Sequence, residues 1–225
     1  MGLVPRRRWI MPTKTGDVPD GIPALVGQVL AGRGISVSEM AAFLAARPSE
    51  AGPPMLDLER AVERLHRALA ARERIVVYGD YDVDGIAGSA ILVRAFRQLG
   101  TSVSAYIPNR YEEGYGINAA ALRQLAADGT RVVVSVDCGV TAVNEALLAR
   151  ELGIDLIVTD HHHPPERLPA AYALVNPRRP GDPSIDKDLA GAGVALVLSR
   201  ALLGELGYAL RQDELLQLVA LATVA

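Results

Sequence analysis

Three aspartates at alternate positions, Asp80, Asp82 and Asp84, are the residues of this chain best suited to chemistry. In an extended segment, side chains at positions i, i+2 and i+4 point the same way, so the three carboxylates are expected to converge. Close negative charges repel one another unless a cation neutralises them. The spacing therefore favours a divalent metal site. The alternative is a solvated acidic turn at the edge of a sheet.

Further acids and imidazoles follow two later apolar runs. Asp137 comes directly after one run, and Asp160, His161 and His162 follow the next. In an open parallel α/β sheet, ligands bind outside the carboxyl ends of the strands, so these residues are expected at one edge. Taken singly, Asp137 is equally well interpreted as a helix cap and the histidines as a solvated turn. Together they predict a single site.

The donor set favours particular metals and a particular reaction. Oxygen donors mixed with a few nitrogens, and no cluster of thiolates, indicate Mn²⁺ or Mg²⁺ before Zn²⁺. Cys138, beside Asp137, is interpreted as a packing residue. A carboxylate between two sets of ligands can bridge two ions, and ions ~3.5–4 Å apart clamp the attacking and leaving oxygens in phosphoryl transfer. The pattern therefore predicts phosphoester hydrolysis.

Two other segments suit a phosphate substrate. Arg110 can bind a phosphate bidentately, and the alternative is an ion pair with Glu112 or Glu113. Gly191 and Gly193 are small enough for backbone N–H groups to approach an anion at the start of a helix. Close helix packing explains the two glycines equally well.

The elements that position these residues alternate between short apolar strands and helices. Strands are expected at 75–78, 103–107, 132–136, 154–158 and 172–175, and helices at 57–72, 86–99, 118–128, 141–152, 190–206 and 212–225. Short β-branched runs separated by helices predict an α/β fold with a parallel β-sheet flanked by helices.

The first part of the chain differs from the rest. Residues 1–53 are expected to form an N-terminal arm with short helices at 23–32 and 37–46. A segment rich in Pro and Gly then separates this arm from a domain over 54–225.

Composition narrows the class of protein. The chain has 225 residues and a net charge of −3, which gives no electrostatic case for a nucleic-acid or membrane partner. Its single cysteine suits a reducing cytoplasm. The run Arg6-Arg7-Arg8 has no apolar stretch behind it, so it is not expected to be a signal peptide, and no segment reads as a membrane span.

The ordered motifs resemble those of a known family. Asp80-x-Asp82-x-Asp84, Asp137, Asp160-His161-His162 and the GAGVA segment resemble the DHH phosphoesterase superfamily. Within it, the segments VVYGDYDVDGIAGSA, YIPNRYEEGYG, VSVDCG, VTDHHHPP and LAGAGVAL resemble the RecJ-type single-stranded-DNA-specific exonucleases. The resemblance covers residues 75–225 closely and makes 54–225 a DHH phosphoesterase domain.

What the resemblance implies is a two-metal enzyme dependent on Mn²⁺ or Mg²⁺. It would remove nucleotides from the 5′ end of single-stranded DNA in repair and recombination, as a cytoplasmic monomer without a membrane anchor. Single-stranded-DNA-binding protein and a helicase would be its partners.

Carried over to this sequence, the resemblance gives each site residue a role. Asp80 and Asp82 would hold one metal, Asp84 and His161 would hold the other, and Asp137 would bridge them.

The remaining roles concern the substrate. Asp160 would orient the histidines, and His162 would contact the scissile phosphate or aid proton transfer. Arg110 would lie near the substrate.

The sequence departs from the family pattern at two places. His163 is a third consecutive histidine, which leaves the register of the ligands open. The chain ends at Ala225, where the family continues with an aspartate ligand, a DHHA1 domain and an OB-like DNA-binding domain. We therefore expect a fragment, with the second ion one ligand short and weak or absent activity on its own.

Two other functions remain open. One is a DHH-family phosphoesterase acting on short oligonucleotides or nucleotide phosphates. The other is a non-catalytic DNA-replication scaffold on the same fold.

Overall fold

The computed structural model describes residues 18–45, 52–101, 103–208 and 212–225. The chain divides into two compact units, one up to Ala51 and one from Gly52 onward. The division lies close to the boundary expected at 53/54, and the assignment of domains to the two parts stays a prediction.

The first unit contains two short helices, α1 (Ala24–Gly32) and α2 (Val37–Leu44). Ser36 precedes α2, and its backbone N–H donates to the carboxylate of Glu39 at 3.0 Å. This contact satisfies a backbone donor that the start of a helix would otherwise leave unpaired. Residues 1–17 and 46–51 of the expected N-terminal arm lie outside the described residues.

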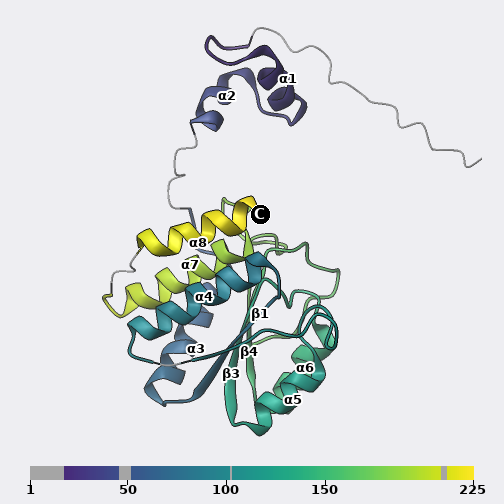
Figure 1. Cartoon of the computed structure of the whole chain (residues 1–225), viewed down its shortest axis with the longest axis vertical. Helices are drawn as coiled ribbons and strands as arrows, with labels where there is room; N and C mark the ends of the chain where they lie inside the picture. Colours follow the sequence, from purple (N-terminus) through teal and green to yellow (C-terminus); the bar gives the residue numbers. More distant parts are fainter. Residues whose placement is uncertain (1–17, 46–51, 102, 209–211) are drawn as a thin grey trace, which may run out of the picture. The chain divides into compact units, whose positions relative to one another are not determined.

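The second unit is built on a parallel sheet of five strands (Figure 1). The strands are β1 (Arg74–Gly79), β2 (Ser104–Tyr106), β3 (Thr130–Val136), β4 (Asp155–Thr159) and β5 (Ala173–Val175). Their order is β2-β1-β3-β4-β5, and every neighbouring pair is parallel. The predicted parallel α/β fold is confirmed.

Helices cover both faces of this sheet. They are α3 (Leu58–Ala70), α4 (Val83–Gln98) and α7 (Gly191–Glu205) on one face, and α5 (Ala119–Ala127) and α6 (Val143–Glu151) on the other. Alternate strand residues enter opposite layers: Val77 and Val134 pack toward α3, α4 and α7, whereas Val76 and Val133 pack toward α5 and α6. Because both layers are apolar, the strands read as continuous apolar runs.

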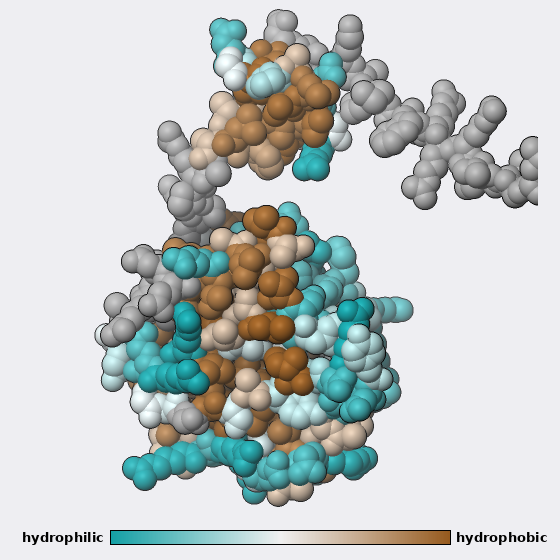
Figure 2. Space-filling model, viewed as in Figure 1, coloured by the Kyte–Doolittle hydropathy of each residue, from teal (hydrophilic) through white to brown (hydrophobic). Residues whose placement is uncertain are grey.

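The last helix, α8 (Gln212–Val224), packs on α4 and α7. Figure 2 shows apolar residues along the side of this unit on which these three helices lie. Ile86, Leu216 and Leu221 are 51%, 44% and 55% exposed, so part of this apolar surface is not covered by the rest of the unit. Among the described helices, none combines the length and the apolar character that crossing a membrane requires.

Candidate metal centre

Three aspartates stand side by side where three neighbouring strands end. Asp80 follows β1, Asp137 follows β3 and Asp160 follows β4. The backbone N–H of each donates to the carbonyl of the last residue of the next strand, at 3.2, 3.0 and 3.1 Å respectively. Each aspartate therefore extends the ladder of the sheet by one residue, which fixes the three in a row along the carboxyl edge.

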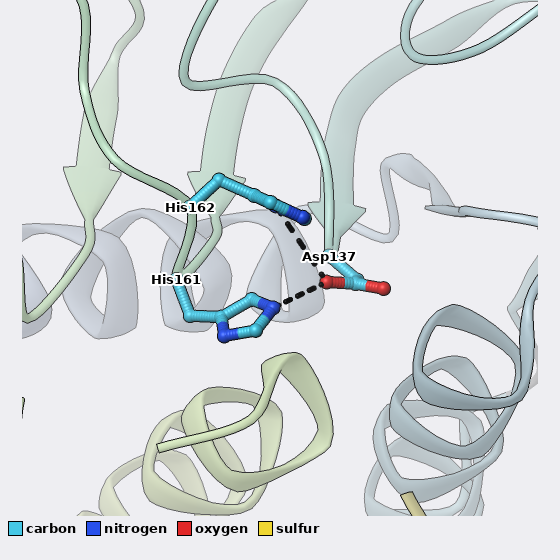
Figure 3. Close-up of side chains that lie close together, drawn as sticks. All are labelled: Asp137, His161 and His162. Atoms are coloured by element: carbon cyan, nitrogen blue, oxygen red, sulfur yellow. Dashed lines mark ion pairs between the residues drawn. The ribbon is translucent and has the colours of Figure 1, made fainter. Parts of the chain in front are cut away.

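Potential metal ligands at this edge form two groups that share one residue. Asp80, Asp82 and Asp137 can bring oxygens within 4.8 Å of one another, and so can donors of Asp137, His161 and His162. Nε2 of His161 lies 3.0 Å and Nδ1 of His162 lies 3.9 Å from Oδ1 of Asp137 (Figure 3). Asp137 is thus placed between a carboxylate group and an imidazole group.

Asp137 is held under strain and buried. Its φ of 61° lies in the left-handed region, and only 1% of the residue is exposed. Burial raises the pKa of Asp137 to about 7 against the lowering effect of His161, and the charges of Asp84 and Asp82 raise it further. Its Oδ1 is buried without a well-directed hydrogen bond, the His161 contact being an ion pair by distance alone. A buried carboxylate oxygen of this kind fits a divalent cation.

Asp160 is equally buried but is fully paired. One oxygen accepts the backbone N–H of His161 at 2.7 Å, that of His162 at 3.1 Å, and Nδ1–H of His162 at 2.8 Å. The other accepts the N–H of Val140 at 2.8 Å. Burial alone would raise the pKa of Asp160, but these hydrogen bonds outweigh it and the pKa is lowered. Asp160 in turn raises the pKa of His162 to about 8.

The Asp80–Asp84 segment corrects one expectation. Asp82 caps α4, because its Oδ1 accepts the N–H groups of Asp84 and Gly85, both at 3.0 Å. The helix therefore begins at Val83 instead of 86, and the extended geometry assumed for the three carboxylates was wrong. Asp80 and Asp82 approach Asp137, whereas Asp84 lies in the first helical turn.

Asp84 meets the start of α7. Its two oxygens accept the backbone N–H groups of Gly191 and Ala192, both at 2.7 Å. One oxygen also lies 3.5 Å from Nε2 of His161, so the carboxylate stays at the edge of the centre. The anion at this helix N-terminus is therefore a residue of the chain itself.

The two glycines of this turn differ in their surroundings. A Cβ on Gly191 would lie 2.7 Å from Cβ of Asp137, whereas a Cβ on Gly193 would lie 3.1 Å from a methyl group of Leu189. Gly191 is thus required for the close approach of α7 to the centre. The substrate contact expected for both glycines stays a prediction, and the N–H of Gly191 already has a partner.

Arg110 contacts an aromatic ring. Its guanidinium carbon lies 5.1 Å from the ring centre of Tyr81. The alternative partner Glu113 is bound instead by Tyr106 and by the backbone N–H of Asn109 at 2.7 Å. Among the described residues no ion pair joins Arg110 to either glutamate, and its role toward substrate stays a prediction.

Sequence reasoning missed two tyrosines. The ring of Tyr115 lies 6.5 Å from that of Tyr81 and 6.3 Å from the imidazole of His162. The only signal for them was their place inside the segments DYDVDG and EEGYG.

The third histidine is separate from the other two. Nε2 of His163 lies 3.3 Å from Nη1 of Arg178, away from the contacts to Asp137. Cys138 is fully buried in the layer between the sheet and α5 and α6.

Residues 74–223 match the model of the DHH family, N-terminal domain. The chain belongs to the DHH family. This confirms the resemblance inferred from the motifs, and the RecJ-type part of that resemblance is confirmed by similar proteins.

The single-stranded-DNA-specific exonuclease RecJ of Bacillus subtilis is 41% identical over 207 residues, which cover 91% of this chain and 26% of that protein. A manganese-bound structure of exonuclease RecJ is 38% identical with a TM-score of 0.70, over 77% of this chain and 44% of that one. RecJ of Thermus thermophilus in complex with Mn²⁺ is 32% identical with a TM-score of 0.69, over 92% and 31%.

This DHH-family chain is short beside its relatives. It spans 26%, 39% and 40% of the length of three curated RecJ proteins that it matches.

Proposed function

We propose that the chain is the catalytic part of a metal-dependent exonuclease that hydrolyses phosphodiester bonds from the 5′ end of single-stranded DNA in repair and recombination. The observation that carries the proposal is the position of Asp137, shared by a carboxylate group and an imidazole group. The names of the curated relatives and the manganese-bound RecJ structures support the substrate and the metal.

The donors suit two ions of Mn²⁺ or Mg²⁺. Asp80 and Asp82 would hold one ion, Asp84 and His161 the other, and Asp137 would bridge them, as the resemblance to the DHH family implies. Each oxygen of Asp84 accepts one N–H, which leaves lone pairs for coordination. When bound, such ions polarise a phosphate and lower the pKa of a water molecule.

The residues of the chain supply orientation and a proton. His162 is held by Asp160, and this hydrogen bond raises the pKa of His162 to about 8, which favours its protonated form. With Nδ1–H bound to Asp160, Nε2–H is free to donate to a phosphate oxygen or to the leaving group. Arg110 would bind a neighbouring phosphate, because a contact with the Tyr81 ring uses none of its N–H donors.

The cellular setting follows from the resemblance. The enzyme would act in the cytoplasm as a monomer, with single-stranded-DNA-binding protein and a helicase as partners. The free, buried thiol of Cys138 agrees with a reducing compartment.

The test is hydrolysis of end-labelled single-stranded DNA by the purified full-length protein, with and without Mn²⁺. Asp82→Asn is the decisive variant, because Asn caps a helix as well as Asp but lacks the charge. We expect turnover to require Mn²⁺ and to be lost in Asp82→Asn. His163→Ala is the matched control, expected to keep turnover within a few-fold, because His163 contacts Arg178 instead of the centre. Full turnover by Asp82→Asn would contradict the metal assignment.

A further inference from the structure

A series of contacts between planar side chains connects a solvent-exposed loop with the candidate metal centre. The guanidinium of Arg110 lies over Tyr81, Tyr81 meets Tyr115 edge-on at an interplanar angle of 79°, and Tyr115 meets His162 edge-on at 82°. The series ends at the imidazole that is hydrogen-bonded to Asp160. Aromatic side chains thus reach the residues proposed to contact the scissile phosphate.

The loop that carries Tyr115 is held in place by buried contacts. The hydroxyl of Tyr78 donates to the carbonyl of Gly116 at 3.0 Å, and Nδ2 of Asn118 donates to the same hydroxyl at 3.2 Å and to Glu113 at 3.1 Å. The glycines on either side of Tyr115 have φ values of 77° and 81°, a conformation that other residues rarely adopt. The position of this ring is therefore fixed by the fold.

Tyr115 nevertheless stays half-exposed, with 54% of the residue accessible. A second tyrosine pair in the same unit has a structural role and provides a comparison for Tyr115. Tyr78 and Tyr106 stack at an interplanar angle of 27°, and Tyr78 is fully buried and hydrogen-bonded. By contrast, the edge-on contacts of Tyr115 leave its ring without a stacked partner among the described side chains. A rigidly held, half-exposed aromatic ring beside a site for phosphate is suited to a nucleobase.

We propose that Tyr115, with Tyr81 beside it, stacks on the base of a nucleotide whose phosphate reaches the metal centre, and that this contact favours unpaired DNA. The inference rests on the proposed function. In a duplex the faces of each base are already stacked on neighbouring bases, so a base must leave the helix before it can lie on a tyrosine. Stacking is tolerant of sequence because every base has a flat face. The two tyrosines would therefore select for single strands without selecting a base.

The experiment uses the full-length protein and single-stranded oligonucleotides that each lack one base, position by position, over the four terminal nucleotides at each end. Binding is measured with Ca²⁺ in place of Mn²⁺, and initial rates of hydrolysis are measured with Mn²⁺. For the wild-type protein, we expect removal of one particular base to weaken binding by about tenfold, in line with base–aromatic stacking. Wild-type binding that is unaffected by every missing base would overturn the proposal without any variant.

Three variants separate stacking from a structural role. Tyr115→Ala is expected to bind the intact strand about tenfold more weakly and to show no further loss when the base is missing. Tyr115→Phe keeps the ring face and should behave like the wild type. Tyr111→Ala is the matched control, because Tyr111 is in the same loop, is 94% exposed, and should leave the discrimination unchanged.

The opposite results have distinct meanings. If Tyr115→Ala lowers the rate equally on all strands and still discriminates against the missing base, Tyr115 only positions His162 and the stacking proposal is wrong. If Tyr115→Ala does not fold, Tyr115→Leu retains bulk without a flat ring and must lose the discrimination for the proposal to stand. A full-length wild-type protein that neither binds nor cuts single-stranded DNA would overturn the proposed function, and the stacking role with it.

Discussion

The ends of β3 and β4 carry two aspartates that are equally buried but whose pKa values are shifted in opposite directions. Asp137 and Asp160 are each 1% exposed, yet the pKa of Asp137 is raised to about 7 and that of Asp160 is lowered. The difference lies in the donors around them. Asp160 accepts four hydrogen bonds, whereas Asp137 faces one imidazole at ion-pair distance and has an oxygen without a directed donor.

Burial alone therefore does not mark a metal ligand. A buried carboxylate that the protein already satisfies is part of the framework, and one that it leaves unsatisfied is available to an external cation. The contrast supports the proposal that Asp137 binds the ions and that Asp160 orients His162.

The largest effect is expected from Asp137→Asn. Asn tolerates a positive φ, so the fold should be retained, but the charge proposed to bridge the two ions is lost. We expect the rate of DNA hydrolysis to fall by about a thousandfold, which corresponds to several kcal/mol of metal-derived stabilisation. Steady-state rates and calorimetric titration with Mn²⁺ would measure the loss of turnover and of ion binding together.

Thermal unfolding without metal gives an independent check on this variant. Folding raises the pKa of Asp137 from about 4 to about 7. The folded protein is therefore destabilised as the pH rises through this range, because the buried carboxyl must lose its proton. Asp137→Asn should therefore melt at the same temperature as the wild type or higher at pH 8. A clearly lower melting temperature would show that Asp137 is a framework residue like Asp160.

An intermediate effect is expected from Gly191→Ala. The added Cβ would lie 2.7 Å from Cβ of Asp137, so either α7 or the carboxylate of Asp137 must move. A misplacement of about 1 Å near reacting groups costs roughly a hundredfold in rate. Gly193→Ala is the matched control, since it shares the gain in helix propensity but its nearest contact is a methyl group of Leu189 at 3.1 Å, with Cβ of Leu189 at 3.4 Å. Equal rates for the two variants would contradict the close approach.

The smallest effect on rate is expected from Asp160→Asn. The amide can replace one oxygen of Asp160, but its NH₂ group would face the N–H of Val140 or of the histidines. We expect a loss of about 1–3 kcal/mol in the free energy of unfolding from the unpaired donors. Looser orientation of His162 should lower the rate by about 10–100-fold. Denaturant unfolding and kinetics would show whether stability falls more than in Asp137→Asn, as the comparison requires.

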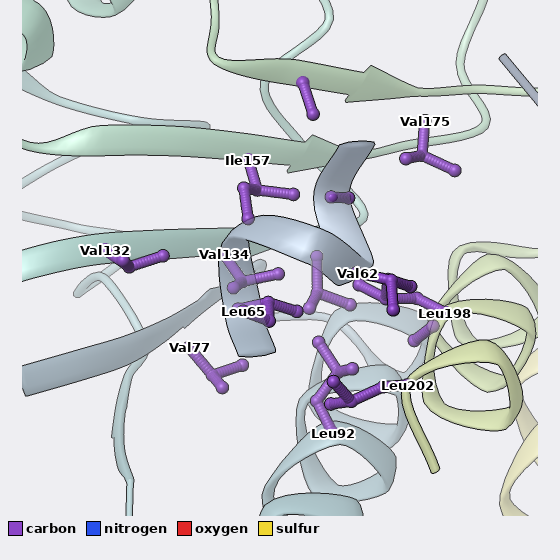
Figure 4. Close-up of a cluster of buried hydrophobic side chains, with 14 of the residues drawn as sticks. Val62, Leu65, Val77, Leu92, Val132, Val134, Ile157, Val175, Leu198 and Leu202 are labelled. Atoms are coloured by element: carbon purple, nitrogen blue, oxygen red, sulfur yellow. The ribbon is translucent and has the colours of Figure 1, made fainter. Parts of the chain in front are cut away.

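Much of the fold was predictable because buried strands appear in the sequence as short runs of apolar residues. The strands pack on α3, α4 and α7 through a buried cluster that includes Val134 of β3, Ile157 of β4 and Leu198 of α7 (Figure 4). Parallel strands covered on both faces give continuous β-branched runs, which identify the strands and place Asp137 and Asp160 at their carboxyl ends.

The rest of the site depends on contacts between residues far apart in the sequence. Alternation along Asp80–Asp84 suggested an extended segment, whereas Asp82 accepts hydrogen bonds from the backbone N–H groups that follow it and starts a helix. Nothing local indicates that the anion at the start of α7 is Asp84, more than a hundred residues earlier. The approach of Tyr115 to His162 is equally non-local. Sequence spacing identified the candidate chemistry, and only the packing shows which partners are already taken.

The position of Asp84 has a practical consequence for experiments that need an inactive enzyme to trap a DNA complex. This carboxylate joins α4 to α7, so its replacement would remove two backbone hydrogen bonds together with a proposed ligand. Loss of activity in such a variant would be uninformative, because misplacement of α7 and loss of an ion would look the same. Asp80 and Asp82 carry no such bond to another helix among the described residues, and the choice of Asn at Asp82 preserves the cap of α4. The inactive protein best suited to capturing its substrate is therefore Asp82→Asn.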